Sequence, residues 1–360
     1  MTGHDFVQRV NDRCEAFLDA KREQITAISS EGAALVDSLS ALTSGGKKLR
    51  PVLAWIGWRA AAAAADDEAV EHLGVALELF QGAALVHDDV IDRSATRRGQ
   101  PSTHRRFQAL HAEEGFSGDA EHFGITGAIL AGDLSLAWAG EAFDAAEASA
   151  AHPSPAGRRR FRQMHTEVIT GQYLDVHAEA APAAVDEAGA LARARAVLTY
   201  KSAKYSTEHP VVLGSALAGA PEALLEQLAQ AALPVGVAFQ LRDDLLGVFG
   251  DPEVTGKPVG DDLREGKRTE LVAYGLFRSG DGARRELSGM LGRGDLTEDD
   301  VARARDILGS CGAVAAVEDE IEAMVQQSIR ATDQLHQHGV AAEVLEDFAA
   351  VRQRLAARTS

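Results

Sequence analysis

Three aspartates and two arginines lie within eleven residues of the chain, at Asp88, Asp89, Asp92, Arg97 and Arg98. Asp88 and Asp92 are four residues apart, so on a helix both project from one face, where their oxygens can share a divalent cation. Guanidinium groups suit the phosphate oxygens that such a metal leaves uncovered. These residue types at this spacing therefore predict a site for a metal-bound diphosphate.

A solvated helix face is the alternative explanation of an acidic cluster. The residues that precede this cluster are apolar, and they include Leu77, Leu79, Phe80, Leu85 and Val86. Such a pattern is typical of a buried helix. Because three buried carboxylates without a cation are very costly, the local context favours a metal site.

A second acidic segment lies much further along the chain, at residues 239–247. There, Gln240, Asp243, Asp244 and Gly247 recur at helical spacing and form one polar stripe. Two such helices that face each other across a bundle can hold metal ions between them. The second segment therefore predicts the other half of the same metal site.

Basic residues occur in three further segments, none of which predicts a phosphate site by itself. The first is the glycine-rich turn Gly45-Gly46-Lys47-Lys48-Leu49-Arg50-Pro51, whose backbone can approach a phosphate closely. The others are Lys201-Ser202 and the segment from Lys257 to Lys267. A single lysine is usually an ordinary surface residue. Together with two acidic segments, these residues indicate a diphosphate site with several cations.

The composition favours close-packed helices. Apolar residues make up 46% of the 360 residues and aromatic residues only 5%, with an alanine run from Ala60 to Ala65. No linker rich in proline, glycine or serine divides the chain. We therefore predict one all-α domain over residues 1–360, with the catalytic motifs between 45 and 267 and a C-terminal helical part from about 280. Thr297, followed by Asp300, resembles the N-terminal cap of a helix in that part.

The charge balance and the cysteines argue against several classes of protein. A formal charge of −18 makes a nucleic-acid partner unfavourable. Cys14 and Cys311 are too few for a disulfide framework, and the N-terminus lacks the apolar core of a signal peptide. No uninterrupted apolar run approaches the ~18 residues of a membrane span. We expect a cytoplasmic protein without a transmembrane segment.

Taken in order, these segments resemble the trans-isoprenyl diphosphate synthases of the polyprenyl synthetase family. The resemblance runs from Gly45 to Lys267, and it also includes Gly132-Asp133 and Gly171-Gln172-Tyr173-Leu174-Asp175. The pattern is most like that of bacterial geranylgeranyl diphosphate synthases. The family implies a single large helical bundle around a central cavity, the isoprenoid synthase type I fold, together with a homodimer and three Mg²⁺ ions.

The resemblance also implies roles for individual residues. The Mg²⁺ ligands are expected at Asp88, Asp89, Asp92, Asp243 and Asp244. The allylic diphosphate is expected to contact Arg97, Lys201, Lys257 and Lys267. Isopentenyl diphosphate is expected to contact Lys47, Arg50, Gln81 and Arg98. The catalytic set would be Asp88, Asp92, Lys201, Ser202, Gln240 and Asp243, with Ser202 and Gln240 presenting oxygen dipoles to the allylic cation.

The implied reaction is a head-to-tail condensation. Metal ions and basic side chains neutralise the diphosphate as the allylic C–O bond breaks, and the double bond of isopentenyl diphosphate attacks the allylic cation. The primer is dimethylallyl, geranyl or farnesyl diphosphate, and the departed diphosphate is the expected base. Three positions depart from the family pattern. Gly247 replaces the third aspartate of the second motif, Ser202 stands for threonine and Lys48 for arginine.

Product length should depend on the residues one and two turns before Asp88, which lie at ~6 and ~12 Å of helix rise below the metals. Ala84 occupies the first level with Ala83 beside it, and Phe80 is the candidate floor. Family members that stop at fifteen carbons usually carry an aromatic residue at one of these two alanine positions. The alanines therefore predict the C20 product, geranylgeranyl diphosphate. Farnesyl or longer products stay open, and Phe80 is equally compatible with a plain core role.

Three other classes of protein share parts of the pattern. A class I terpene cyclase also has the first acidic motif, but it needs no second substrate site. A helical His-Asp metal phosphohydrolase would use His87 and Asp88, with His72 or His104 as further ligands. That class gives no role to the basic segments. A non-catalytic partner subunit would explain Gly247, although such subunits generally lose the first motif, which this chain keeps.

Overall fold

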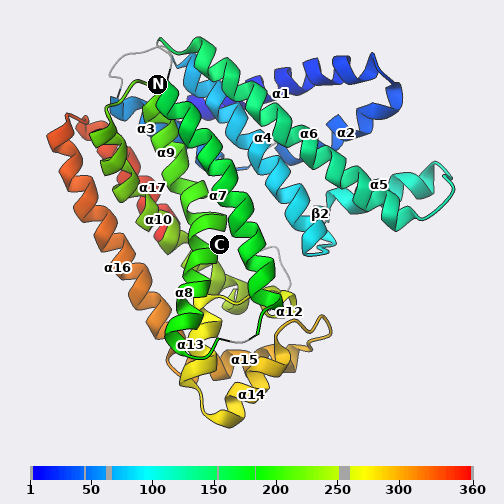
Figure 1. Cartoon of the computed structure of the whole chain (residues 1–360), viewed down its shortest axis with the longest axis vertical. Helices are drawn as coiled ribbons and strands as arrows, with labels where there is room; N and C mark the ends of the chain where they lie inside the picture. Colours follow the sequence, from blue (N-terminus) through cyan, green and yellow to red (C-terminus); the bar gives the residue numbers. More distant parts are fainter. Residues whose placement is uncertain are drawn as a thin grey trace. The chain divides into compact units, whose positions relative to one another are not determined.

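The computed structural model describes residues 3–43, 46–61, 67–151, 154–182, 184–250 and 260–357. Within these ranges the secondary structure is helical except for one short antiparallel hairpin, in which β1 (Thr96–Arg97) pairs with β2 (Gln100–Pro101). Figure 1 shows the helices in chain order. The prediction of an all-α fold is confirmed.

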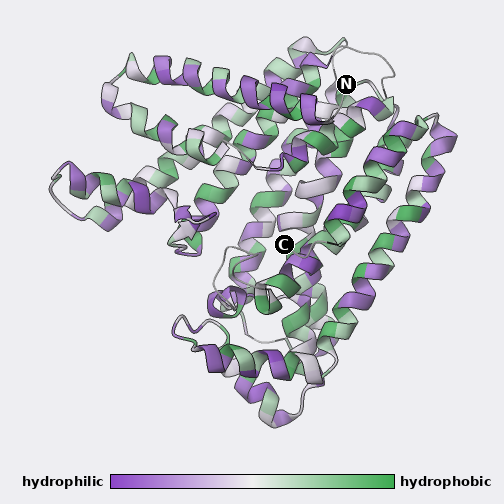
Figure 2. Cartoon of the chain, turned by 180° about the vertical axis from the view of Figure 1, so that it is seen from behind, coloured by the Kyte–Doolittle hydropathy of each residue, from purple (hydrophilic) through white to green (hydrophobic). Residues whose placement is uncertain are grey.

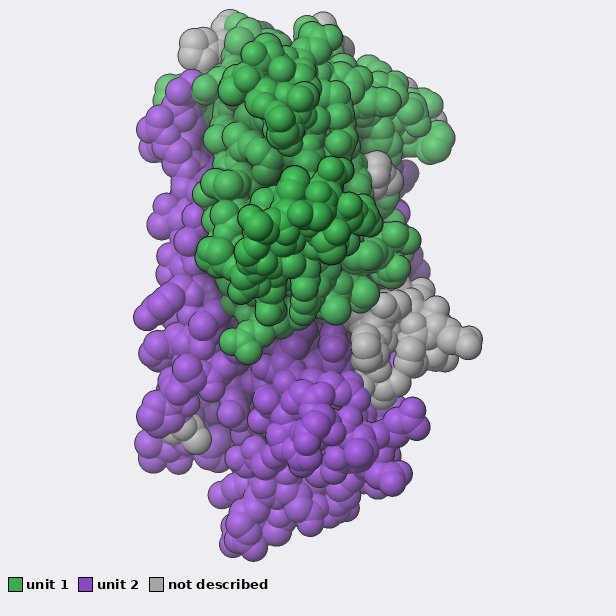
Figure 3. All heavy atoms as spheres, turned by 90° about the vertical axis from the view of Figure 1, so that its right-hand side faces the viewer, with its two compact units in different colours: residues 1–155, 214–219 green, residues 156–213, 220–360 purple. Residues whose placement is uncertain are grey.

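The chain divides into two compact units, which Figure 3 colours separately. Unit 1 comprises residues 1–155 and 214–219, and unit 2 comprises residues 156–213 and 220–360. The expectation of one domain stays a prediction, because compact units of one chain can still fold together.

Unit 1 carries the first acidic motif and the glycine-rich turn. Its helices are α1 (Gly3–Thr26), η1 (Ser30–Gly32), α2 (Ala33–Thr43), α3 (Leu49–Ala61), α4 (Glu68–Ile91), α5 (Thr103–Glu113), α6 (Ala120–Ser149) and the end of α9 (His209–Leu217). The long helices α4 and α6 lie side by side (Figure 1). Gly132 of α6 permits this approach, because a Cβ there would lie only 2.3 Å from Nε2 of His87 on α4. Ser135 of α6 donates a hydrogen bond to the carbonyl of Leu79 at 2.7 Å.

By length and mean hydropathy, α4 and α6 could each cross a membrane. Buried residues form 72% of the apolar window of α4 but only 39% of that of α6. The search for uninterrupted apolar runs missed both helices, because scattered polar residues break the runs without lowering the average enough. One or two such helices do not distinguish a membrane span from a core helix.

Unit 2 carries the second acidic motif and the later lysines. Its elements are α7 (Pro155–Ala180), α8 (Glu187–Val197), the π-helix η2 (Leu198–Glu208), the start of α9, α10 (Glu222–Phe249), α12 (Asp261–Glu265), α13 (Glu270–Arg278), α14 (Asp281–Met290), α15 (Glu298–Ser310), α16 (Ala313–Gln334), η3 (Leu335–His338) and α17 (Ala342–Ala356). The predicted cap of α15 is confirmed, since Thr297 and Asp300 form a reciprocal capping box.

The core of unit 2 forms where α10 packs against α16 and η2. Leu241 and Leu245 of α10 are buried in one cluster with Val317 and Ile321 of α16. Figure 2 shows hydrophilic and hydrophobic residues alternating along most ribbons, as amphipathic helices require. The apolar face of α10 therefore fixes its polar stripe, which carries the second acidic motif.

Candidate active site

The first acidic motif ends α4, with Asp92 as the residue that caps its C-terminus. Asp89 is fully buried, and Asp88 is partly buried with a side-chain exposure of 22%. Arg97 donates from Nε to Oδ1 of Asp89 at 2.9 Å and from Nη2 to Oδ2 of Asp88 at 3.3 Å. Burial opposes the charge of Arg97, but the hydrogen bond to Asp89 and the nearby aspartates raise the pKa of Arg97 above its ordinary value. The first acidic motif therefore carries its own arginine, which pairs with two of its three aspartates.

The hairpin after α4 delivers both arginines. Its register pairs Arg97 with Gln100, and the two residues between them have positive φ, +54° at Arg98 and +73° at Gly99. Two such residues fit the primed turns that join antiparallel strands. A non-glycine residue in this region is uncommon, and such residues cluster at functional sites. A Cβ built on Gly46 would lie 3.7 Å from Nη1 of Arg98, so the hairpin brings Arg98 to the glycine-rich turn.

The glycine-rich turn leads into α3 and presents its cations there. Lys47 is exposed, and Arg50 is partly buried in the first turn of α3. A helix N-terminus carries partial positive charge, which adds to these side chains in attracting a phosphate. Gln81 of α4 is partly buried, seven residues before Asp88 and hence on the same helix face. In unit 1 the structure therefore brings Arg98 to the turn that carries Lys47 and Arg50.

In unit 2, Lys201 lies on the π-helix beside α7. Its Nζ forms an ion pair with Oδ2 of Asp175. Gly171 of α7 makes this approach possible, because a Cβ there would lie 2.2 Å from the backbone nitrogen of Lys201. Asp175 belongs to a segment that resembles the family, but the sequence alone predicted no role for this residue. The spacing of Gly171 and Asp175, one turn apart on α7, is the signal that could have found it.

A charged network holds the π-helix that carries Lys201 and Ser202. Glu167 of α7 accepts hydrogen bonds from Nε2 of His209 at 2.8 Å and from Nζ of Lys204 at 2.9 Å. Burial opposes ionisation of Glu167, yet hydrogen bonds from His209, Gln163 and Lys204 hold its pKa at about 2. This network joins α7 to the π-helix and so supports the element that carries Lys201. Such π-helical turns often mark functional sites.

The second acidic motif lies on α10. Gln240 donates from Nε2 to Oδ1 of Asp244 at 2.9 Å. Asp244 is buried, and burial followed by the charge of Asp262 raises the pKa of Asp244 well above its ordinary value. Asp243 is partly buried one residue earlier on the same helix. The second motif therefore gathers carboxylates of α10 and α12, and the charge of Lys267 offsets part of the rise in the pKa of Asp244.

The missing third aspartate of this motif has a structural counterpart. A Cβ built on Gly247 would lie 1.9 Å from Oδ2 of Asp262, on the short helix α12. Asp262 is buried, and its Oδ1 accepts a hydrogen bond from Nζ of Lys267 at 3.2 Å. A carboxylate thus occupies the space beside Gly247, but it comes from another segment. Sequence reasoning missed Asp262, although it lies within the quoted segment from Lys257 to Lys267.

The remaining predicted residues have mixed positions. Lys257 lies outside the described residues, as does Gly45 of the glycine-rich turn. Phe80 and Ala83 are each 2% exposed, whereas Ala84 is partly buried. Ala84 precedes Asp88 by one helical turn and shares its face, while Ala83 points toward the core. Of the two alanines, Ala84 is therefore the better placed to line a cavity near the aspartates.

Comparison with known proteins decides the identity of this arrangement. The family model for polyprenyl synthetase matches residues 33–308. The chain belongs to the polyprenyl synthetase family. It is therefore a head-to-tail isoprenyl diphosphate synthase, which is a trans-prenyltransferase, and the resemblance seen in the sequence is confirmed. The phosphohydrolase alternative is wrong.

Solved structures and curated relatives of this polyprenyl synthetase span several product lengths. A geranylgeranyl pyrophosphate synthase from Corynebacterium glutamicum, crystallised with isoprenyl diphosphate and magnesium, superposes with a TM-score of 0.91 at 36% identity, covering 99% of this chain and all of that one. The isoprenoid synthase fold is thereby confirmed. Geranylfarnesyl diphosphate synthase from Aeropyrum pernix is 32% identical over 81% of this chain and 84% of its own. A farnesyl diphosphate synthase from Mycobacterium tuberculosis H37Rv is 34% identical over 74% and 67%.

The carboxylates of the synthase suit a hard cation, because Mg²⁺ prefers oxygen ligands. Among the described residues, no three side chains of histidine, cysteine, aspartate or glutamate converge on one point. In unit 1, Arg97 contacts both Asp88 and Asp89. The donor set fits Mg²⁺ chemically, and the arginine must share these carboxylates with any metal that binds.

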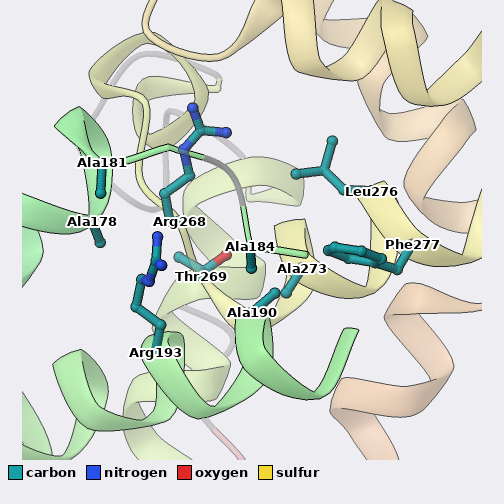
Figure 4. A pocket seen from close by; sticks show the side chains of 10 residues that line it. All are labelled: Ala178, Ala181, Ala184, Ala190, Arg193, Arg268, Thr269, Ala273, Leu276 and Phe277. Atoms are coloured by element: carbon teal, nitrogen blue, oxygen red, sulfur yellow. The ribbon is translucent and has the colours of Figure 1, made fainter. Parts of the chain in front are cut away.

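A small cavity of the synthase lies in unit 2, and Arg268, which lines it, directly follows Lys267 in the chain. It measures about 60 Å³, and ten residues line it: Ala178, Ala181, Ala184, Ala190, Arg193, Arg268, Thr269, Ala273, Leu276 and Phe277. Figure 4 shows the alanines and Phe277 around it, with the guanidinium of Arg268 directed away from that of Arg193. The two guanidinium groups therefore do not converge on one point in this cavity.

Proposed function

We propose that this synthase condenses isopentenyl diphosphate with an allylic primer and stops at geranylgeranyl diphosphate. Ala84 carries the proposal, because a small, partly buried residue one turn before Asp88 leaves room for a growing chain. Phe80, which precedes Ala84 by one more turn of α4, is the proposed floor. The likeness to the synthase from Corynebacterium glutamicum supports the C20 product, although relatives at similar identity make shorter and longer ones.

We propose three Mg²⁺ ions, held by the aspartates of the two motifs, namely Asp88, Asp89, Asp92, Asp243 and Asp244. When bound, they neutralise the diphosphate as the allylic C–O bond breaks. The cations proposed to hold the allylic diphosphate are Arg97, Lys201, Lys257 and Lys267. Arg97 already lies against Asp88 and Asp89, and it can turn a guanidinium edge to a phosphate oxygen without leaving the site. Magnesium bound to the Corynebacterium relative supports this assignment.

The polar groups near the breaking bond are oriented by their neighbours. Gln240 donates one amide hydrogen to Asp244, and this bond orients the amide so that its oxygen can face a positive charge. Ser202 follows Lys201 on the π-helix and offers a hydroxyl oxygen from the same element. We propose that both stabilise the allylic cation. Isopentenyl diphosphate would bind the four groups assembled around the glycine-rich turn and α4, namely Lys47, Arg50, Gln81 and Arg98.

We also propose a homodimer that resides in the cytoplasm. Helix α6 exposes large apolar side chains at Phe123, Ile129 and Leu130, with exposures of 36%, 42% and 52%. Contiguous exposed apolar residues mark interaction surfaces, and a second copy of the chain is the proposed occupant. Sedimentation of the protein and of Leu130→Glu tests this, since a monomeric wild-type protein would contradict it. The two free cysteines suit a reducing compartment.

Product analysis tests the proposed reaction. The protein is incubated with labelled isopentenyl diphosphate, Mg²⁺ and each allylic primer in turn, and the released prenyl alcohols are separated by chromatography. Geranylgeraniol is expected to dominate, and chelation of Mg²⁺ should stop turnover. A dominant C15 or C25 alcohol would overturn the chain length only. Cyclic hydrocarbons formed without isopentenyl diphosphate would instead indicate a terpene cyclase.

A further inference from the structure

The glycine-rich turn contains one lysine that points inward. The side chain of Lys48 is 1% exposed, while its neighbour Lys47 is exposed. The Nζ of Lys48 lies 2.7 Å from Oε2 of Glu78 on α4, and it also donates to the carbonyl of Thr43 at the end of α2. Because Glu78 neutralises this charge, Lys48 offers little to a phosphate. Its position instead ties the turn to α4.

The backbone at Lys48 sets the start of α3. Its φ is +44°, in the left-handed region that non-glycine residues seldom occupy. Its carbonyl accepts the hydrogen bond from the amide of Val52 at 3.0 Å, which closes the first turn of α3. Arg50 lies in that turn, and Lys47 directly precedes Lys48. One buried side chain therefore fixes both cations that are proposed to bind isopentenyl diphosphate.

The other partner of the pair lies on the helix that carries the first aspartates. Glu78, Gln81, Asp88 and Asp92 follow one another on a single face of α4, since they are three, seven and four residues apart. Ten residues of helix place Glu78 about 15 Å from Asp88 along the axis. The pair thus sets the basic turn at a fixed distance from the proposed metal ligands.

The surroundings of the pair are apolar and closed. Glu78 has a side-chain exposure of 13%, and Cys14 of α1 lies near enough to feel both charges. Burial raises the pKa of Cys14 to about 12. Burying an ion pair in such a place costs free energy, because both charges lose their hydration. Its contribution here is to fix the position of the turn relative to α4.

We propose that Lys48 is a positioning residue, which through Glu78 holds Lys47 and Arg50 in register with the aspartates of α4. The inference rests on the proposed role of those cations in binding isopentenyl diphosphate. It predicts that a change at Lys48 affects the two substrates differently, because the allylic diphosphate is assigned to other residues. A merely structural role would affect both substrates alike.

The test compares Lys48→Met with wild-type protein. The KM for isopentenyl diphosphate is expected to rise about tenfold, while the KM for the allylic primer stays within about twofold. Calorimetric binding of isopentenyl diphosphate alone should weaken by the same factor. Lys48→Arg keeps the charge, so most of the affinity should return.

A matched control exists in the same unit. Lys21 is also buried and paired, 2.6 Å from Glu141, but it lies on α1 away from the turn. Lys21→Met should leave the KM for isopentenyl diphosphate unchanged. If Lys48→Met does not fold, Lys48→Met with Glu78→Met removes the uncompensated charge, and it should show the same tenfold rise.

Three results would overturn the inference. They are an unchanged KM for isopentenyl diphosphate in folded Lys48→Met or in the double variant, a parallel rise for both substrates, and an equal rise in Lys21→Met. A wild-type protein that does not bind isopentenyl diphosphate would refute the proposed function instead.

Discussion

The two acidic motifs reach similar ends by different means. On α4 the aspartates find a partner in the same stretch of chain, since Arg97 of the hairpin lies only eight residues after Asp89 and donates a hydrogen bond to it. On α10 the companion of Asp244 is another carboxylate, Asp262, which arrives from eighteen residues further along the chain. The first motif can therefore be understood from one stretch of sequence. The second depends on how distant segments pack.

The two acidic motifs also differ in the charged groups that surround their aspartates. The first motif carries its own guanidinium, which offsets one of its three carboxylate charges before any ligand binds. In the second, burial and Asp262 both oppose ionisation of Asp244. Lys267 forms ion pairs with Asp262 and Glu265, and its charge offsets part of the rise in the pKa of Asp244. The carboxylates of the second motif are therefore met by a lysine from another segment.

The largest expected effect breaks the first motif. Asp88→Asn should lower kcat/KM by about a thousandfold or more, because it removes a charge that holds the metal-bound diphosphate. Asp243→Asn should have a comparable effect if both motifs hold one metal cluster. Steady-state kinetics with saturating Mg²⁺ measures both. The double variant should then lose far less than the product of the two factors, since the groups act as a unit.

Asp19→Asn is the control for this pair, because Asp19 is an exposed carboxylate on α1. It should leave kcat/KM unchanged. Strictly multiplicative losses in the double variant of Asp88 and Asp243 would show that the motifs act on separate ligands, and the shared site would be abandoned.

The next effect concerns the space beside Gly247. Gly247→Ala should destabilise the fold by up to about 3 kcal/mol, because its Cβ displaces the buried carboxylate of Asp262. Thermal unfolding measures the loss. Gly289→Ala is the matched control on α14, where a Cβ meets open space, and it should be neutral or slightly stabilising. Gly247→Asp would restore the usual motif, yet it should not raise kcat. A higher kcat would mean that a ligand is truly missing.

A smaller effect tests the support of the second region. Glu167→Gln removes a carboxylate whose folded pKa is about 2, below its ordinary value of 4.5. A lowered pKa stabilises the fold at pH values above the ordinary pKa, and this contribution disappears as the pH falls toward 2. At pH 7 the variant should lose roughly 1 to 2 kcal/mol, after allowance for solvent screening.

Denaturant unfolding at several pH values provides the measurement. The difference between Glu167→Gln and wild type should shrink steadily below pH 4.5. Glu113→Gln, at an exposed position on α5, should show no such trend. A difference that is independent of pH would indicate lost packing rather than lost charge.

The smallest effect on rate should accompany a change of product, which only the first region is expected to control. Ala84→Phe should shorten the main product to C15, and Phe80→Ala should lengthen it beyond C20. Chromatography of the prenyl alcohols distinguishes these outcomes. Phe6→Ala removes another fully buried ring of unit 1, and it should leave product length as it is. An unchanged product in Phe80→Ala would remove Phe80 as the floor.

The sequence was sufficient wherever the chemistry is local. Helical spacing identified the face that carries Asp88 and Asp92, and the capping pair Thr297 and Asp300 located the start of α15. Asp262 escaped notice because its contact with Gly247 arises from the return of the chain, which no short-range pattern records. The π-helix at Lys201 escaped for a similar reason. Propensity does not specify an extra residue per turn, and the close packing at Gly171 becomes visible only in three dimensions.

The inward turn of Lys48 is a further case in which neighbours override local preference. Its residue type predicts an exposed side chain, whereas the tertiary partner Glu78 and a left-handed backbone place it inside. The high mean hydropathy of α4 and α6 also escaped the sequence analysis, because polar residues interrupt the apolar runs of both helices.

The brevity of the turn after α4 limits how this region can evolve. Each arginine has its own place in the hairpin, so deleting one residue in β1 would bring Arg98 to the position from which Arg97 meets the carboxylates. Such a deletion would give Arg98 the contact that we propose for Arg97 with the allylic diphosphate. It would also remove a cation from the proposed site for isopentenyl diphosphate. Deletions should therefore be rare between residues 93 and 99, while point changes at Ser94 or Ala95 remain open to selection.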